Sequence, residues 1–404
     1  NGQSKQCQNL TSEIYKLDMN EWKIYKLSEI GTIIGGATPS TSNPHYYGGQ
    51  IPWITPKDLS TLNGRFIEKG ERNITEKGLS SCSAQLLPQG SILFTSRAPI
   101  GYVAIAKNPI TTNQGFKSIV PNEKVNNIFL YYLMVYNKSN IEAMGSGTTF
   151  KEVSGSTMKK VEIRIPNIDV QKRIASILAS LDDKIELNRR INDNLEEQAK
   201  ALFNHYFIQN TENLGEWQDG VLTDIAQYLN GLAMQKYPAM PNEAGLPVLK
   251  IKELGQGQCD TNSDRCSSLI KPEYIISDGT IIFSWSGTLL VDIWCGGKCG
   301  LNQHLFKVSS AKYPQWFVFY WTKHHLNKFI RIAKDKAVTM GHIKRCDLEI
   351  SKVKIPSKQA LVNLDKLFSP IFNRMVTCRI ENRKLSSLRD TLLPKLMSGE
   401  ISVE

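Results

Sequence analysis

Long apolar runs are missing from this sequence of 404 residues. No stretch reaches the roughly 18 to 20 consecutive apolar residues that a membrane-spanning helix needs. The segment from Asn1 to Gln8 is too polar for the core of a signal peptide. We therefore expect a cytoplasmic protein with no membrane partner. Cysteine is also sparse, because eight thiols at irregular spacings do not indicate a disulfide framework in so long a chain.

The common catalytic motifs are missing too. There is no G-x-x-x-x-G-K-[ST] phosphate loop, no G-x-G-x-x-G turn after a strand, no H-E-x-x-H and no G-x-S-x-G. Asn43-Pro44-His45-Tyr46 is close to the Asn-Pro-Pro-Tyr motif of amino-methyltransferases, but no glycine-rich cofactor loop precedes it, so we interpret it as a turn. The six histidines do not pair at metal-binding spacings. The sequence thus predicts no catalytic site, no metal site and no cofactor in this chain.

Four cysteines in the second half leave one alternative open. A C-x6-C and a C-x3-C spacing, formed by Cys259, Cys266, Cys295 and Cys299, could hold zinc. Structural zinc sites usually use tighter pairs of ligands. The first half has no equivalent set, so we favour ordinary thiols.

Positive charge is what the sequence has in excess. Lysine and arginine number 49 against 38 acidic residues, which gives a net charge of +11. Hydrophobic residues make up 41% of the chain, enough for buried cores in the two or three domains that this length suggests. The charge favours a polyanionic partner such as a nucleic acid.

The two halves of the chain repeat one another. Residues 21–30 and 51–59 resemble residues 216–225 and 246–254, each 195 positions later. Further along, three segments recur 189 or 190 positions later: 90–94 at 279–283, 113–114 at 302–303, and 161–166 at 351–356. Anchors in the same order with small drifts in spacing indicate a duplicated domain, since solenoid repeats are much shorter.

Each half reads as a compact α+β module. Short β-rich segments at 91–94, 102–106 and 116–120 are bounded by Gly, Pro and Asn, and a helix is expected at 127–136. The second half repeats this with strands at 280–284 and 304–308 and an aromatic helix around 316–321.

Two long amphipathic helices follow the modules. Residues 170–207 contain no Pro or Gly, and a second apolar pattern begins after Ser357, with Pro394 and Gly399 expected to end it. We expect the two helices to pair antiparallel along a seam, and the alternative is that each packs on its own module. The predicted seam residues are Leu181, Asn188, Ile191, Leu195, Leu202, Ile371, Met375, Asn382, Leu385 and Leu392. The two asparagines would fix the register of the pair.

The expected fold class is α+β, with two similar globular α/β domains separated by two long antiparallel helices that form a coiled-coil rod, as a pseudo-twofold internal repeat. The predicted domains are an N-terminal extension (1–20), a first module (21–165), a central helical region (166–209), a second module (210–355) and a distal helical region (356–404).

Polar loops at matching places in the two modules are the candidate binding residues. Arg, Lys, Asn and Gln read base edges, and basic or hydroxyl groups hold phosphates. The candidates are Lys57, Ser96, Arg97, Asn113, Gln114, Thr149 and Lys151 in the first module, and Lys250, Lys252, Trp285, Ser286, Asn302, Gln303, Thr339, His342 and Lys344 in the second. The Asn-Gln pairs equally suit a role in holding their own turns.

In combination, these segments resemble the specificity subunit of a Type I restriction–modification enzyme, from Glu21 to Glu404. The resemblance rests on the order and duplication of short anchors. They are Trp22, Leu87-Pro88-Gln89-Gly90-Ser91-Ile92-Leu93, Ile165-Pro166 with Gln171-Lys172-Arg173-Ile174, Asn302-Gln303-His304-Leu305, and Leu392-Leu393-Pro394-Lys395-Leu396-Met397-Ser398-Gly399-Glu400. Cys295-Gly296-Gly297-Lys298-Cys299 and residues 1–19 depart from the pattern.

This resemblance implies two target recognition domains, each reading half of a split, asymmetric site in double-stranded DNA. It implies helical regions that set the gap between the halves and dock two modification subunits. Methyl transfer, translocation and cleavage would belong to the modification and restriction subunits, which would bind S-adenosylmethionine, ATP and Mg²⁺. Two alternatives stay open: a protein-interaction scaffold without sequence-specific DNA binding, and a stand-alone methyltransferase, for which no cofactor loop is found.

Overall fold

The computed structural model describes residues 22–147, 151–209, 217–335 and 341–403, so the predicted N-terminal extension lies outside the described residues. The chain divides into two compact units. The first unit ends its first segment at Glu186 and resumes at Leu385, and the second runs from Leu187 to Lys384. Each unit therefore holds one α+β module together with part of each long helix. Each of the two predicted helical regions is therefore divided between the units, one part packing in each.

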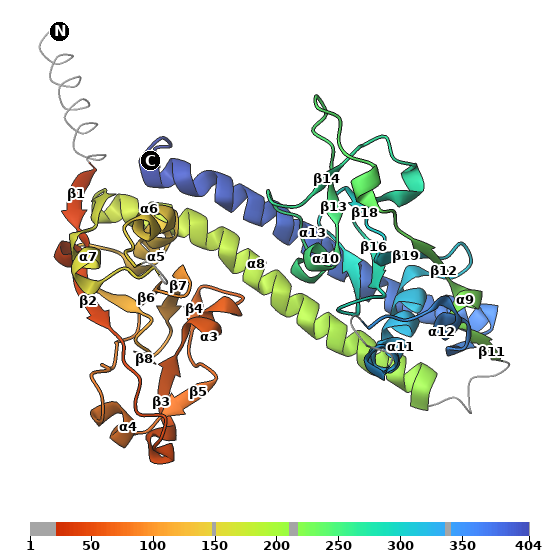
Figure 1. Ribbon diagram of the computed structural model, residues 1–404, viewed down its shortest axis with the longest axis horizontal. Coiled ribbons are helices and arrows are strands. Elements are labelled where there is room, and N and C mark those ends of the chain that lie inside the picture. The colour runs from red at the N-terminus through yellow and green to blue at the C-terminus, as the bar shows by residue number, and fades with distance from the viewer. Residues whose placement is uncertain (1–21, 148–150, 210–216, 336–340, 404) are drawn as a thin grey trace, which may run out of the picture. The chain divides into compact units, whose positions relative to one another are not determined.

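The first module is built from short strands and helices (Figure 1). Its strands are β1 (Lys23–Lys26), β2 (Gly31–Gly35), β3 (Tyr47–Ile54), β4 (Phe66–Ile67), β5 (Arg72–Ile74), β6 (Ile92–Ser96), β7 (Ile100–Ala106), β8 (Thr111–Thr112), β9 (Lys117–Pro121) and β10 (Glu162–Ile165). Its helices are α2 (Leu27–Ile30), α3 (Pro56–Ser60), α4 (Glu76–Ser80), α5 (Asn127–Tyr136), α6 (Lys138–Ala143) and α7 (Gly155–Lys160). The helix predicted at 127–136 is confirmed.

The strands of the first module form three sheets. The largest has the order β2-β9-β6-β7-β4, a second has the order β5-β3-β8, and β1 pairs antiparallel with β10. All residues of β6 are buried, as expected for a central strand covered on both faces. The β1–β10 pair joins the two ends of the module and leads directly into the first long helix.

The second module has the strands β11 (Gln218–Val221), β12 (Gln227–Asn230), β13 (Leu246–Leu249), β14 (Arg265–Cys266), β15 (Ile275–Ile276), β16 (Thr280–Ser284), β17 (Leu290–Trp294), β18 (Cys299–Leu301), β19 (Leu305–Ser309) and β20 (Lys352–Ile355). Its helices are α9 (Leu222–Ile225), α10 (Ile251–Gln256), α11 (Gln315–Asp335) and α12 (Arg345–Glu349). The sheet orders are β12-β19-β16-β17, β14-β13-β18-β15 and β11-β20.

The two modules share a core topology, since the order β2-β9-β6-β7 recurs as β12-β19-β16-β17. They differ at the edges, because β4 extends this sheet only in the first module and β15 extends the other sheet only in the second. In both, a first and last strand pair antiparallel, in the registers Lys23 with Ile165 and Gln218 with Ile355. In both, one strand pairs parallel with the strand before the Asn-Gln turn, β3 with β8 and β13 with β18. Gly90 and Gly279, with φ of +85° and +84°, precede the matching strands β6 and β16. A positive φ at that turn favours glycine in both modules.

The first long helix, α8, spans Ile168–Phe203 and continues into a π-helical turn, Asn204–Gln209. Its 36 residues correspond to about 54 Å of helix at 1.5 Å per residue. The second, α13, spans Lys358–Ser398 without a break at Pro370 or Pro394. The expectation that Pro394 helps to end the helix is wrong, because the core contacts of Leu393 and Leu396 offset the lost hydrogen bond and the crowding that a proline causes. The helix ends before Gly399, whose φ is +79°.

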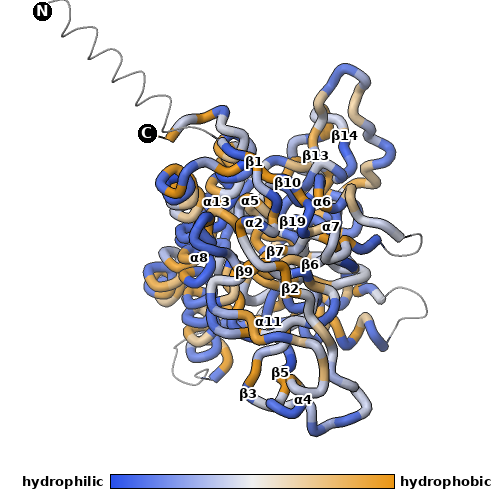
Figure 2. Tube along the Cα trace, turned by 90° about the vertical axis from the view of Figure 1, so that its left-hand side faces the viewer, coloured by the Kyte–Doolittle hydropathy of each residue, from blue (hydrophilic) through white to orange (hydrophobic). Residues whose placement is uncertain are grey.

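Both units show the two long helices in contact, and in antiparallel order. In the first unit, Val170, Ile174 and Leu178 of α8 share a core with Leu393 and Leu396 of α13. In the second unit, the core instead combines the C-terminal part of α8 with the N-terminal part of α13, through Ala199, Phe203, Leu364, Phe368 and Phe372. Blue and orange stretches alternate along both helices in Figure 2, as expected for amphipathic segments.

Asn188 and Asn382 meet in the second unit. Asn188 is fully buried, and its Nδ2 donates to Oδ1 of Asn382 at 2.9 Å and to Oε2 of Glu381 at 2.8 Å. Of the other predicted seam residues, Met375 is buried and the remainder are half-buried, namely Leu181, Ile191, Leu195, Leu202, Ile371, Leu385 and Leu392. Among the described residues, no helix is both long enough and apolar enough to span a lipid bilayer.

Candidate nucleic-acid interface

Each module brings the same loops together beside the Asn-Gln turn. The backbone N–H of Asn113 donates to the carbonyl of Ile54 at 2.9 Å, and that of Asn302 donates to Leu249 at 3.2 Å. Gly36 and Gly231 face these turns so closely that an added Cβ would lie 2.1 Å from the carbonyl oxygen of Asn113 or 2.2 Å from that of Asn302. Only glycine fits such an approach. Each module therefore builds the same arrangement of a close glycine and an Asn-Gln turn, which we call the platform.

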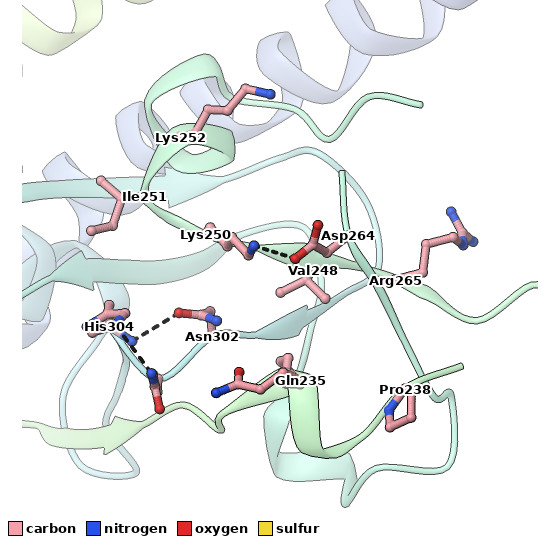
Figure 3. Close-up of a pocket in the computed structure, with 12 residues that line it drawn as sticks. Gln235, Pro238, Val248, Lys250, Ile251, Lys252, Asp264, Arg265, Asn302 and His304 are labelled. Atoms are coloured by element: carbon pink, nitrogen blue, oxygen red, sulfur yellow. Dashed lines mark hydrogen bonds and ion pairs between the residues drawn. The ribbon is translucent and has the colours of Figure 1, made fainter. Parts of the chain in front are cut away.

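In the second module this platform borders a cavity of about 550 Å³ (Figure 3). Four predicted residues, Lys250, Lys252, Asn302 and Gln303, line it together. They come from the entry and first turn of α10 and from the turn between β18 and β19. The other lining residues are Met234, Gln235, Pro238, Val248, Ile251, Asp264, Arg265 and His304. The cavity therefore combines cations and amides over an apolar floor, the residue types that bind phosphates and base edges.

The charged side chains of the cavity are held loosely. Lys250 forms an ion pair with Asp264, and Nζ of Lys252 lies 3.7 Å from Oδ2 of Asp260. These two lysine side chains remain 43% and 57% exposed. Nη2 of Arg265 donates to the carbonyl of Gly245 at 2.7 Å. Exposed pairs of this kind contribute little stability, so the lysines can exchange their partners for a phosphate at small cost.

The two asparagines of the repeated turns serve the turns themselves. Oδ1 of Asn113 accepts from the N–H of Gly115 at 2.9 Å, and Oδ1 of Asn302 accepts from that of His304 at 3.3 Å. The neighbouring glutamines point to other groups. Gln114 accepts a hydrogen bond from Thr38, and Nε2 of Gln303 lies 3.4 Å from Nε2 of His304. Gln114 therefore reaches outside its turn, whereas Gln303 lies beside the imidazole that follows it and lines the cavity.

The predicted residues after β16 lie beside the same turn. Oγ of Ser286 is 3.0 Å from Nδ1 of His304, and Ser286 forms a β-bridge with His342. The ring of Trp285 lies 5.9 Å from that of His304 and 6.4 Å from that of His342, between centroids, and its Nε1 donates to Asn230 at 3.0 Å. An exposed edge of this cluster offers aromatic and imidazole groups next to the cavity.

In the first module the predicted residues form more internal contacts. Ser96 is fully buried, and its hydroxyl donates to the carbonyl of Gly115, so it belongs to the fold and is not exposed to a ligand. Arg97 and Lys117 both pair with Glu152, at 3.4 Å. Lys57 pairs with Glu71 at 2.7 Å, on the surface.

The remaining predicted residues lie near gaps in the described chain. Thr149 and Thr339 lie outside the described residues. Lys151, His342 and Lys344 follow these gaps and are exposed.

Sequence reasoning missed Gln235, Arg265 and His304 as lining residues. His304 directly follows the Asn-Gln pair, a signal that was available. Gln235 and Arg265 carried none, because only the fold brings their segments to the turn.

The cysteines of the second module are free thiols, and Cys266 and Cys299 are buried. Burial raises the pKa of Cys259 and of Cys295 to about 11, so both are protonated at neutral pH. Among the described residues, no group of three or more His, Cys, Asp or Glu side chains has the arrangement of a metal site.

The fold has a counterpart among solved structures. The crystal structure of a Type I restriction–modification system S subunit from M. genitalium aligns with a TM-score of 0.58 at 16% identity, covering 93% of this chain and 96% of that one. At this identity the likeness shows the fold. This chain, with its two sheet-rich modules and long helices, thus shares the fold of that S subunit, and the predicted fold class is confirmed.

Sequence comparison gives the family. The family described as "Type I restriction modification DNA specificity domain" matches residues 19–197. The MjaIX specificity subunit of Methanocaldococcus jannaschii, a Type I restriction enzyme subunit, is 36% identical over 409 residues, covering 95% of this chain and 94% of that protein. The EcoR124I/EcoR124II specificity subunit of Escherichia coli is 32% identical over 169 residues, 40% of this chain and 41% of the relative. This chain belongs to the family of Type I restriction enzyme specificity subunits.

Proposed function

We propose that this chain recognises a two-part sequence in double-stranded DNA, with each module reading one part. The observation that carries the proposal is the repeated platform: equivalent glycines and Asn-Gln turns, surrounded by different side chains in the two modules. Two modules that share a backbone arrangement but carry different side chains around it are suited to recognise two different DNA sequences. Family membership supports sequence-specific recognition over the scaffold alternative.

The cavity of the second module supplies the chemistry for such a reader. Lys250 and Lys252 at its edge suit phosphate oxygens, which fix the position of the duplex. Gln303 and Gln235 inside it each offer an amide donor and acceptor, and that pair of groups matches base edges in the major groove. Binding driven by the lysines and by the net charge of +11 should weaken steeply as salt rises.

The long helices are proposed to act as a spacer. Helix α8 connects the two modules in the chain, and its length of about 54 Å is an upper bound on the separation that it can impose. Equivalent major-groove positions on one face of DNA recur about every 34 Å. Half-sites with centres about one turn apart fit both values.

The catalytic steps are assigned to partners. We expect the helices to dock two modification subunits, through which restriction subunits join the complex. S-adenosylmethionine, ATP and Mg²⁺ would bind those subunits. The sequence supports this division, because it contains no phosphate loop and no glycine-rich cofactor loop.

Selection of bound sequences from random duplex DNA by the full chain tests the proposal. We expect the selected DNA to contain two different short sequences, which we call words, separated by a fixed gap. Replacing residues 21–165 with the corresponding module of a relative should change one word and leave the other intact. A change in both words, or binding that is indifferent to sequence and to salt, would contradict independent reading.

A further inference from the structure

The second module is fastened to α13 by two arginines. Nη1 of Arg383 donates to Oδ1 of Asp278 at 2.6 Å, and Nη2 donates to Oδ2 at 2.8 Å, a two-pronged ion pair. One helical turn away, Nη1 of Arg379 donates to Oδ1 of Asp292 at 2.6 Å and to the carbonyl of Ile293 at 3.2 Å. We call these two pairs the α13 clamp. Asp278 precedes β16 and Asp292 lies within β17, so the clamp joins α13 to the β16–β17 side of the β12-β19-β16-β17 sheet.

The Cys295–Cys299 loop, which departs from the family pattern, is shaped to meet this clamp. Its Cys295 carbonyl accepts from Arg383 at 2.6 Å, and the N–H of Gly297 donates to Asp278 at 2.8 Å. Gly297 has a φ of +90°, and an added Cβ on Gly296 would lie 2.2 Å from the indole of Trp294. Both positions therefore require glycine. The loop closes around the guanidinium, which leaves this arginine side chain 32% exposed.

The first module is fastened to α8 by the opposite arrangement of charge. Here the arginine belongs to the module, since Arg65 pairs with Asp183 and with Glu186, and its Nε lies 3.2 Å from Oε1 of Glu186. The side chain of Arg65 is only 4% exposed. We call this group the α8 clamp. Next to it, the buried Asp182 accepts from the hydroxyl of Tyr132 at 2.6 Å and from Arg389 of α13 at 2.7 Å.

These pairs differ from ordinary surface ion pairs. Exposed pairs contribute about 0 to 1 kcal/mol. A bidentate arginine–carboxylate pair such as Arg383 with Asp278 fixes geometry as well as charge. The hydrogen bond from Arg383 lowers the pKa of Asp278 below its usual value, so the pair stays charged at neutral pH. Arg383 binds Asp278, which precedes β16, and the carbonyl of Cys295, which follows β17. Arg65 binds two carboxylates about one turn apart on α8. Two points of attachment restrain rotation of a module on its helix.

We propose that the arginines of the two clamps are positioning residues, which fix the angle of each module on its helix and so restrict the gap that the chain accepts between half-sites. This inference rests on the proposed function. Lengthening the gap by one base pair moves a half-site by about 3.4 Å and turns it by about a tenth of a helical turn. A module that can rock on its helix absorbs such a displacement, and a clamped module does not.

The test measures the affinity of the full chain for its selected site with the native gap and with a gap one base pair longer. In an Arg379→Gln/Arg383→Gln variant, the preference for the native gap should fall about threefold or more, within the range for coupled residue pairs. The two words should stay the same. Arg374→Gln, an exposed arginine on the same helix, is the matched control and should keep the wild-type preference.

Far-UV circular dichroism checks that each variant is folded. If the double variant unfolds, Arg383→Lys and Arg65→Gln replace it, and each should reduce the preference for the native gap. An unchanged gap preference in a folded variant would overturn the inference, and so would a changed word, since the arginines would then act on the reading surface. If the wild-type chain selects no two-part site, it is the proposed function that fails.

Discussion

At the scale of single residues, the asparagine and the glutamine of each Asn-Gln turn have different roles. The sequence showed Asn113-Gln114 and Asn302-Gln303 as repeated pairs, with reading and turn-holding as equal alternatives. The structure assigns the asparagines to the turns, because their Oδ1 atoms accept local backbone hydrogen bonds. It leaves Gln303 at the cavity. Such a division depends on side-chain direction, which the spacing of residues in a sequence does not contain.

Two substitutions at the cavity should have different effects. Lys252→Ala should weaken binding about equally for all sequences and reduce the slope of log affinity against log salt by about 1, as expected if Lys252 makes the proposed phosphate contact. Gln303→Ala should relax the preference at one base pair, by about 1 to 3 kcal/mol. Fluorescence anisotropy with variant duplexes at several salt concentrations measures both. Lys312→Ala, an exposed lysine of the same module outside the cavity, is the control; a matching loss there would discount a specific role for Lys252.

A buried histidine gives the second unit a pH dependence. His325 donates from Nε2 to the carbonyl of Lys352 at 2.8 Å, and burial lowers its pKa to about 4. A histidine that is neutral when folded contributes stability that is fully present above pH 6.5 and is lost as the pH falls toward 4. Urea unfolding followed by tryptophan fluorescence should lose about 2 kcal/mol between pH 7.5 and pH 5 through this group. His325→Gln should lack that loss, and an identical pH profile in both proteins would contradict the assignment.

At the scale of elements, periodicity predicted the helices well and their ends less well. Helix α5 and the meeting of Asn188 with Asn382 follow from spacing alone. The passage of α13 through Pro394 does not, because tertiary contacts of Leu393 and Leu396 support a turn that local propensity disfavours. The clamps were also missed. A charge such as Arg65 or Asp278 looks like any surface charge until the fold brings its partner within reach.

Helix length should set the gap. In the second unit Asn188 faces Asn382, and in the first unit Asp182 faces Arg389, so steps along α8 match reverse steps along α13. Seven residues inserted after Glu186 and seven after Lys384 therefore extend both helices at one level. The insertion adds about 10.5 Å, so the preferred gap should grow by about three base pairs. Gap selection measures this, and an unchanged gap would contradict a spacer role for the helices. Insertion into α8 alone should disturb the pairing of the helices.

At the scale of the whole molecule, duplication explains both what recurs and what differs. The order of four core strands, the parallel pairs and the close glycines recur because they build the platform. The side chains around it, the helix that each module is clamped to and the polarity of the clamps differ between the modules. A sequence repeat reveals the recurring part, whereas the unlike part becomes visible only in three dimensions.

The methylation pattern of DNA from cells that carry this gene with its partner subunits tests the central claim most directly. Methylated sites made of two unlike words at one fixed gap are expected, with one word replaced when residues 21–165 are exchanged. Methylation at a single uninterrupted word, or at two words with a freely varying gap, would contradict it.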